Sequence, residues 1–133
     1  MAERSFFAVS TLLWLGYGVY CFFQPGVLAE MAGVMGSTPT ATTELRAMYG
    51  GAQAGIGLLC AGAFAQATLR RPALLALLFI VGGLGTTRLL GALLDGSFTS
   101  YTFSGLGFEW ATIAVAAWLL SRTSTPPAAT FSS

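Results

Sequence analysis

Charged residues are scarce in this chain of 133 residues. Only 8% of the residues are Asp, Glu, Lys or Arg, whereas roughly a quarter is usual for a soluble domain. All six basic residues are arginines, and the net charge is +1. So few charges argue against an ordinary soluble enzyme, and so small a positive excess argues against a protein that binds nucleic acid.

Histidine is absent and cysteine nearly so. Without imidazole the chain lacks the usual ligand of haem, di-iron and catalytic zinc sites. Cys21 and Cys60 lie 39 positions apart, which gives neither a CxxC redox pair nor a disulfide framework. We therefore expect no metal and no cofactor.

Long apolar runs dominate the sequence. Hydrophobic residues make up 55% of the chain, and the mean hydropathy is +0.73. Four runs, at about 6–23, 44–69, 72–94 and 103–121, are each near the ~20 residues that cross a bilayer as a helix. The first run could instead be a signal peptide, but no small-x-small cleavage site follows it. The sequence predicts an all-α, four-helix transmembrane bundle over residues 1–122, with a flexible cytoplasmic tail at 123–133.

The arginines predict the orientation of this bundle. Arg4 precedes the first run, Arg70 and Arg71 form the turn between the second and third, and Arg122 follows the fourth. These places share one side of an even-numbered bundle, which the positive-inside rule makes cytoplasmic. We expect both termini inside, with most acidic residues toward the other side.

The connection at 24–43 on that other side has features of its own. Pro25 suits the first position of a helix, and Leu28, Met31 and Met35 recur at near-helical spacing. This pattern predicts a short interfacial helix that ends before Pro39. Thr42 or Thr43 is then the expected cap of the second membrane helix.

Small residues recur at four-residue intervals in the second and third runs. Gly51 and Gly55 form one stripe, and Gly83, Thr87 and Gly91 form another. Such stripes let helices approach closely. Two interpretations remain open, because the stripes can serve packing within one chain or the interface of a homo-oligomer.

The charges inside the apolar runs are the candidate functional residues. Arg88 and Glu109 should face the interior, because an unpaired charge in a bilayer is costly. Helical spacing places further polar residues nearby, which predicts one cluster in the outer-leaflet half: Glu44, Arg46, Tyr49, Gln53, Arg88, Asp95 and Glu109. The cluster is either an ion-pair latch that fixes helix register or a cavity that holds a headgroup, a carboxylate or a polar small molecule.

Three segments carry a resemblance to a known family. Segment 44–51 reads Glu-Leu-Arg-Ala-Met-Tyr-Gly-Gly, segment 88–91 reads Arg-Leu-Leu-Gly and runs on to Asp95, and Glu109 stands near the start of the fourth run. These motifs resemble a family of small bacterial four-helix membrane proteins that is classed as a domain of unknown function. More distantly, the layout is similar to DoxX-like proteins and to the membrane chaperones that help nicotinic receptors assemble. The resemblance implies the bacterial inner membrane as location, supports the topology and the charged cluster, and implies no established activity.

Three hypotheses of function follow. The first is a non-enzymatic membrane protein that binds a membrane lipid, a lipid-like or a small amphipathic molecule, or assists a partner membrane protein. The second is a membrane-embedded enzyme acting on a lipid, sterol or quinone, with Glu109 as acid/base and Arg88 as electrostatic stabiliser. The third is a small proton-coupled exporter. Nearby arginines would hold Glu109 ionised, which favours the first hypothesis over the two that need a titrating carboxyl group.

Overall fold

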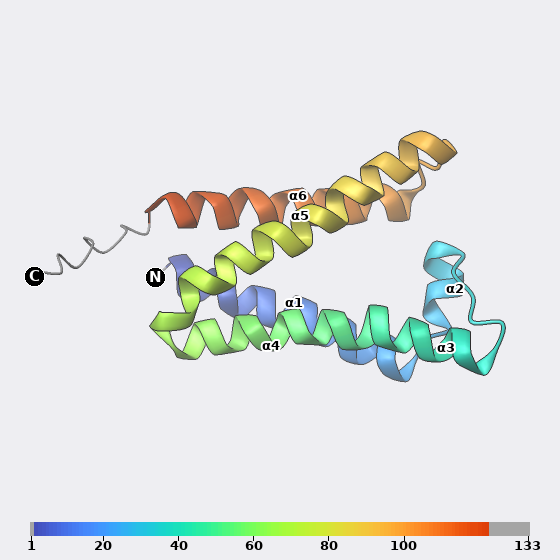
Figure 1. Ribbon diagram of the computed structural model, residues 1–133, viewed down its shortest axis with the longest axis horizontal. Helices are drawn as coiled ribbons and strands as arrows, with labels where there is room; N and C mark the ends of the chain where they lie inside the picture. Colours follow the sequence, from blue (N-terminus) through green and yellow to red (C-terminus); the bar gives the residue numbers. More distant parts are fainter. Residues whose placement is uncertain (1, 123–133) are drawn as a thin grey trace, which may run out of the picture.

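The computed structural model describes residues 2–122, and this part of the chain is helical without a strand (Figure 1). The predicted tail at 123–133 lies outside the described residues. In chain order the elements are α1 (Ala2–Phe23), α2 (Val27–Ala32), α3 (Pro39–Leu45), the π-helical turn η1 (Arg46–Gly51), α4 (Ala52–Ala65), the 3₁₀ turn η2 (Ala67–Leu69), α5 (Arg70–Asp95) and α6 (Ser100–Arg122). The all-α class expected from the sequence is confirmed.

Three helical stretches within residues 2–122 are long and apolar enough to cross a membrane. They are Ala2–Phe23, Ala67–Asp95 and Ser100–Arg122. Many of their large side chains face outward; Leu12, Phe79 and Leu94 are 76%, 79% and 86% exposed. Water would disfavour such a surface, whereas lipid would cover it.

The second predicted run, 44–69, differs from a single uninterrupted α-helix. The helical backbone continues from α3 through η1 into α4, but it widens to a π-helical turn over Arg46–Gly51. A π-turn inserts an extra residue into the helical repeat. α4 alone has 14 residues, short of a membrane span.

The cap predicted at Thr42 or Thr43 is wrong. The helix begins at Pro39, and Thr38 caps it by accepting a hydrogen bond from the Ala41 backbone N–H at 3.1 Å. Proline suits this first position because its ring fixes a helical φ and no N–H is needed there. Thr42 and Thr43 instead donate to the carbonyls of Thr38 and Pro39.

The turn between α4 and α5 also lies earlier than predicted. α4 ends at Ala65, Gln66 is extended, and Arg70 and Arg71 belong to the first turn of α5. Arg70 donates from Nε to the Ala63 carbonyl at 3.3 Å. The guanidinium therefore satisfies one of the carbonyls that the end of α4 leaves without a helical partner.

The interfacial helix is present but shorter than the pattern suggested. α2 begins at Val27, after a turn that contains Pro25, and ends where Gly33 adopts a left-handed φ of 69°. Met35 lies beyond it. Leu28 is fully buried and anchors α2 to the rest of the molecule.

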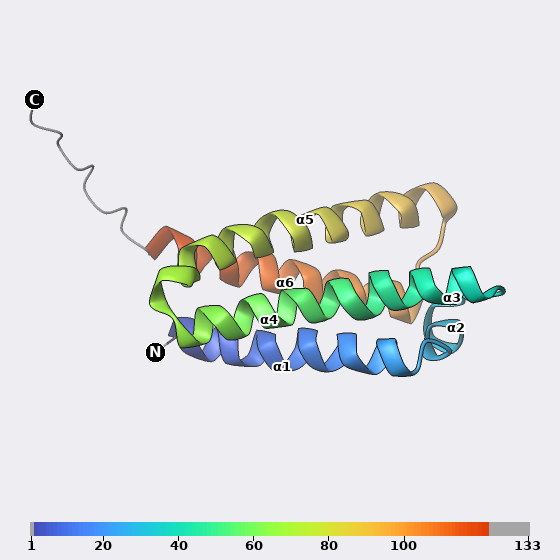
Figure 2. The same cartoon turned by 60° about the horizontal axis from the view of Figure 1, so that its bottom comes forward.

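The long helices associate in two pairs, α1 with α4 and α5 with α6 (Figure 2). α1 and α4 come very close, since a Cβ on Gly18 would overlap the Ala54 backbone and one on Gly57 the Leu15 backbone. The stripe predicted from Gly51 and Gly55 does not make this contact, because a Cβ on Gly55 would meet only open space. Gly50 and Gly57, in the same glycine-rich stretch, face α1 instead.

The two pairs share one hydrophobic core, which lies toward the end of the molecule where α1 starts and α6 finishes (Figure 1). Its buried members come from all four long helices: Phe7, Trp14, Ile56, Cys60, Ala63, Ala73, Leu74, Leu77, Val81, Ala116 and Leu119. This end also holds Arg4, Arg70 and Arg122, and Arg70 lies 3.5 Å from Glu3. The opposite end of the two pairs holds the candidate site.

Candidate functional site

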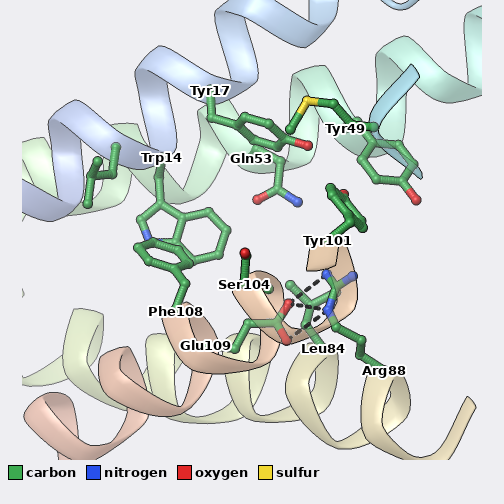
Figure 3. Close-up of a pocket in the computed structure, with 13 residues that line it drawn as sticks. Trp14, Tyr17, Tyr49, Gln53, Leu84, Arg88, Tyr101, Ser104, Phe108 and Glu109 are labelled. Atoms are coloured by element: carbon green, nitrogen blue, oxygen red, sulfur yellow. Dashed lines mark hydrogen bonds and ion pairs between the residues drawn. The ribbon is translucent and has the colours of Figure 1, made fainter. Parts of the chain in front are cut away.

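A buried ion pair joins α5 to α6. The Arg88 guanidinium donates from Nη2 to Glu109 Oε1 at 2.7 Å, and from Nε to both carboxylate oxygens at 3.0 Å (Figure 3). Glu109 is only 3% exposed. The contact predicted between these two residues is therefore present, and charge-assisted bonds of this kind are among the strongest in proteins.

Two glycines make room for the ion pair. A Cβ on Gly105 of α6 would lie 2.9 Å from Arg88 Nε and 3.0 Å from Cζ. A Cβ on Gly85 of α5 would lie 3.3 Å from the Cβ of Glu109. Each helix thus carries one charged side chain and one glycine that accommodates the other helix's charge, so the two backbones can approach around a bidentate contact.

The ion pair forms part of the wall of a pocket of about 290 Å³ between the two helix pairs. Thirteen residues line it, from α1, α2, η1, α4, α5 and α6: Leu13, Trp14, Tyr17, Met31, Tyr49, Gln53, Leu84, Arg88, Tyr101, Ser104, Gly105, Phe108 and Glu109. Most of this lining is aromatic or aliphatic. A few polar groups among apolar walls are typical of small-molecule sites.

Two polar atoms in the pocket have no hydrogen-bond partner. Among the described residues, the buried side-chain polar atoms without a hydrogen bond are Gln53 Oε1 and Trp14 Nε1, and both residues line this pocket. Figure 3 shows the Gln53 carboxamide extending from α4 toward the Arg88–Glu109 pair. A buried acceptor left without a donor is costly, so the pocket offers a bonding site that the chain itself does not fill.

The apolar part of the pocket lies on its other side. The Trp14 and Phe108 rings stand 5.2 Å apart, and Leu13 and Leu84 complete this region. Tyr17, Tyr49 and Tyr101 project around the polar side (Figure 3). The pocket is therefore amphipathic: the ion pair and Gln53 face each other across its polar part, and the Trp14–Phe108 contact lines the apolar part.

A wider hollow of about 650 Å³ adjoins the pocket and shares Met31, Tyr49, Arg88 and Tyr101 with it. It is bordered by the end of α2 and by the hydroxyl-rich connection from α5 to α6, where Gly96 has a left-handed φ of 64°. Arg88 stands at the junction, with its Cζ 5.7 Å from the centre of the Tyr101 ring. We call this hollow, with its hydroxyl groups, the vestibule.

The structure brings together four of the seven predicted site residues and leaves three apart. Tyr49, Gln53, Arg88 and Glu109 line the pocket. Glu44, Arg46 and Asp95 are exposed and do not line it, so the single seven-residue cluster is wrong.

The three displaced residues have physical reasons to lie elsewhere. Arg46 donates from Nε to the Phe22 carbonyl at 3.1 Å, where it caps the end of α1. Asp95 is the last residue of α5, about 10 Å along the helix from Arg88 at 1.5 Å per residue. Glu44 lies in α3, one turn before the helix reaches the pocket.

Several pocket residues were not predicted from the sequence, although their spacing along one face of a helix can be read from it. On α6, Tyr101, Ser104, Gly105 and Phe108 follow the spacing of one helical face. On α1, Trp14 and Tyr17 are three residues apart. Aromatic residues on one helical face usually indicate a core, so this signal alone does not distinguish a packed interior from a pocket.

The chemistry available here is recognition rather than metal binding. Within residues 2–122, no group of three or more His, Cys, Asp or Glu side chains is placed to hold a metal ion. Both oxygens of Glu109 are engaged by one guanidinium. The site therefore offers a charge-balanced ion pair, an unpaired amide acceptor, an unpaired indole N–H and mostly apolar walls.

Comparison with known proteins identifies the family of this chain but no specific function. No curated protein and no solved structure matches the chain. The similarity to DoxX-like proteins thus stays a prediction. The match to a family covers residues 2–120, nearly all of the part that the structure describes. The chain belongs to the DUF4345 family, a domain of unknown function.

Proposed function

We propose that this chain is a four-span membrane protein of the bacterial inner membrane whose pocket binds a lipid-like or small amphipathic molecule. Three stretches of the described chain have the length and apolarity to span. The fourth span is the continuous helical path from α3 through η1 to α4, which runs beside α1 (Figure 2). The arginine-rich end, with Arg4, Arg70, Arg71 and Arg122, faces the cytoplasm by the positive-inside rule.

The observation that carries this proposal is the unpartnered Gln53 carbonyl opposite the Arg88–Glu109 pair. A latch that only fixes helix register would need the ion pair and nothing more. It would not need a pocket of about 290 Å³ whose facing wall holds an unsatisfied acceptor. A bound molecule accounts for both features, because it would fill the space and supply the missing donor.

The geometry supports the enzyme and exporter hypotheses less well. A general acid or a proton-exchanging carboxyl group must take up and release a proton during the cycle. Both oxygens of Glu109 already accept hydrogen bonds from Arg88, so neither is left free to exchange a proton with a substrate. A ligand-binding role requires no proton transfer by the ion pair.

Association with another protein is a separate proposal with its own residues. Gly55 on α4 and Gly83 and Gly91 on α5 have open space where a Cβ would stand. They form surfaces on which a second copy or a partner membrane protein could pack closely. Cross-linking of cysteines introduced beside them in native membranes tests this interface.

Mass spectrometry of molecules that co-purify with the protein tests the binding function. The full chain, Arg88→Met and the control Arg46→Met would be extracted under identical mild conditions. Arg46 is an arginine at the same end of the molecule but outside the pocket. We expect the wild type and Arg46→Met to carry the same molecule in equal amounts. Arg88→Met should retain roughly a tenth of that amount or less, because it lacks one charge-assisted hydrogen bond to the ligand. Equal amounts in all three samples would refute the proposal.

A further inference from the structure

The charge balance of the pocket limits what it can hold. Of its thirteen lining residues, all in the described part of the chain, Arg88 and Glu109 are the charged ones, and they neutralise each other. An ionised ligand would bring an uncompensated charge into a site with mostly apolar walls. The pocket therefore suits an uncharged molecule better than a phosphate, a carboxylate or an amine.

The unfilled hydrogen-bonding positions limit the ligand further. Gln53 Oε1 needs a donor, and the Trp14 Nε1–H group needs an acceptor. The bonds from Arg88 to Glu109 use Nε and Nη2. Tyr101 contacts the same guanidinium, and the N–H groups that remain can serve an acceptor. The Gln53 side chain extends into the pocket from α4, across from this guanidinium (Figure 3).

A hydroxyl group meets both needs with a single atom. Its O–H can donate to the Gln53 carbonyl while its oxygen accepts from Arg88. An ester or ether oxygen accepts only, and an alkane does neither. The groups on the wall thus distinguish an alcohol from its close apolar relatives, which is the kind of discrimination that buried polar groups make well.

We propose that the pocket selects an uncharged amphiphile whose hydroxyl group bridges Gln53 and Arg88 while its apolar body lies against Trp14 and Phe108. This inference rests on the binding function proposed above and names the ligand class. A volume of about 290 Å³ is at the low end of small-molecule pockets, so the buried apolar body is short. Any larger polar part extends through the vestibule past Tyr49 and Tyr101.

Quenching of Trp14 fluorescence by brominated probes tests this directly. The chain has three tryptophans, and replacing Trp110 and Trp118 by Phe leaves Trp14 as the reporter in the pocket. The full-length variant would be reconstituted in phosphatidylcholine vesicles. The probes share a ten-carbon bromoalkyl chain: 10-bromodecan-1-ol, 1-bromodecane, methyl 10-bromodecanoate and 10-bromodecanoate.

Three further variants complete the experiment. A variant that retains only Trp118, whose side chain is exposed, reports the quenching caused by partition into lipid. Gln53→Leu removes the amide at similar size. Gln66→Leu makes the same change at an exposed position between α4 and η2, outside the pocket.

We expect 10-bromodecan-1-ol to half-quench Trp14 at a concentration about tenfold lower than the other three probes, after correction for partition. Gln53→Leu should abolish this preference, and Gln66→Leu should retain it. If 1-bromodecane, the ester or the carboxylate quenches as well as the alcohol, or if Gln53→Leu keeps the preference, the ligand class is wrong while pocket binding stands. If no probe quenches Trp14 beyond the Trp118 reference, the binding function itself fails with it.

Discussion

Gly105 of α6 lies directly against the guanidinium of Arg88 on α5, so that a Cβ at this position would stand 2.9 Å from Nε. Gly85 of α5 has the same relation to Glu109 of α6, because a Cβ on Gly85 would lie 3.3 Å from the Cβ of Glu109. The ion pair is thus built from four positions on two helices rather than from two charges alone. The polar wall of the pocket depends on the glycines as much as on the charges.

Gly105→Ala should disturb this wall without preventing folding. The added methyl group must displace the Arg88 side chain, which is flexible, so we expect a loss of about 1 kcal/mol in stability and weaker ligand retention. Gly107→Ala is the matched control, because a Cβ there meets nothing within 4 Å. Thermal unfolding and mass spectrometry on the two variants check this. Equal ligand content in both would show that Gly105 does not position the guanidinium.

Arg88→Met alone and Arg88→Met with Glu109→Gln separate stability from binding. The single change leaves a buried carboxylate without its partner and should destabilise the fold by about 3–5 kcal/mol. The double change removes that charge and should recover much of the stability. Neither variant should retain the ligand. A double variant that still carries the ligand would show that the pair takes no part in binding. Recovery of melting with no ligand in any sample would mean that the pair is only a latch.

Gly57→Ala should weaken the contact of α1 with α4. A Cβ on Gly57 would overlap the backbone of Leu15, which cannot move aside as a side chain can. We expect the free energy of unfolding to fall by about 1–3 kcal/mol, which is the usual range for an overpacked contact. Gly55→Ala on the same helix meets open space and should leave the melting temperature unchanged or slightly higher. Equal melting of the two variants would contradict the close approach.

The proposed orientation predicts the location of reporters. A reporter enzyme fused after Ser133 should be active only in its cytoplasmic form, because Arg4, Arg70, Arg71 and Arg122 share that side. A reporter inserted next to Gly36, between α2 and α3, should be periplasmic. Finding both reporters on one side of the membrane would be incompatible with the four spans.

The Arg88–Glu109 pair could be predicted because a charge within an apolar helix needs a partner and few candidates exist. Arg46 was misplaced because its partner is the Phe22 carbonyl, a backbone group that becomes available only where α1 happens to end. The contact of Gly18 with Ala54 was missed for a related reason, since glycine spacing within one helix does not reveal which face meets its neighbour. Helix type and apolar span are local properties that a sequence expresses directly, whereas caps and close approaches depend on pairs of elements.

An experimental density map of the protein isolated gently from native membranes would show whether the pocket holds a ligand. We predict connected non-protein density in the pocket, with its polar end between Gln53 and Arg88 and its apolar end beside Trp14 and Phe108. A well-resolved map in which the Gln53 carboxamide bonds directly to Arg88, with α1 and α6 closed over an empty interior, would contradict it.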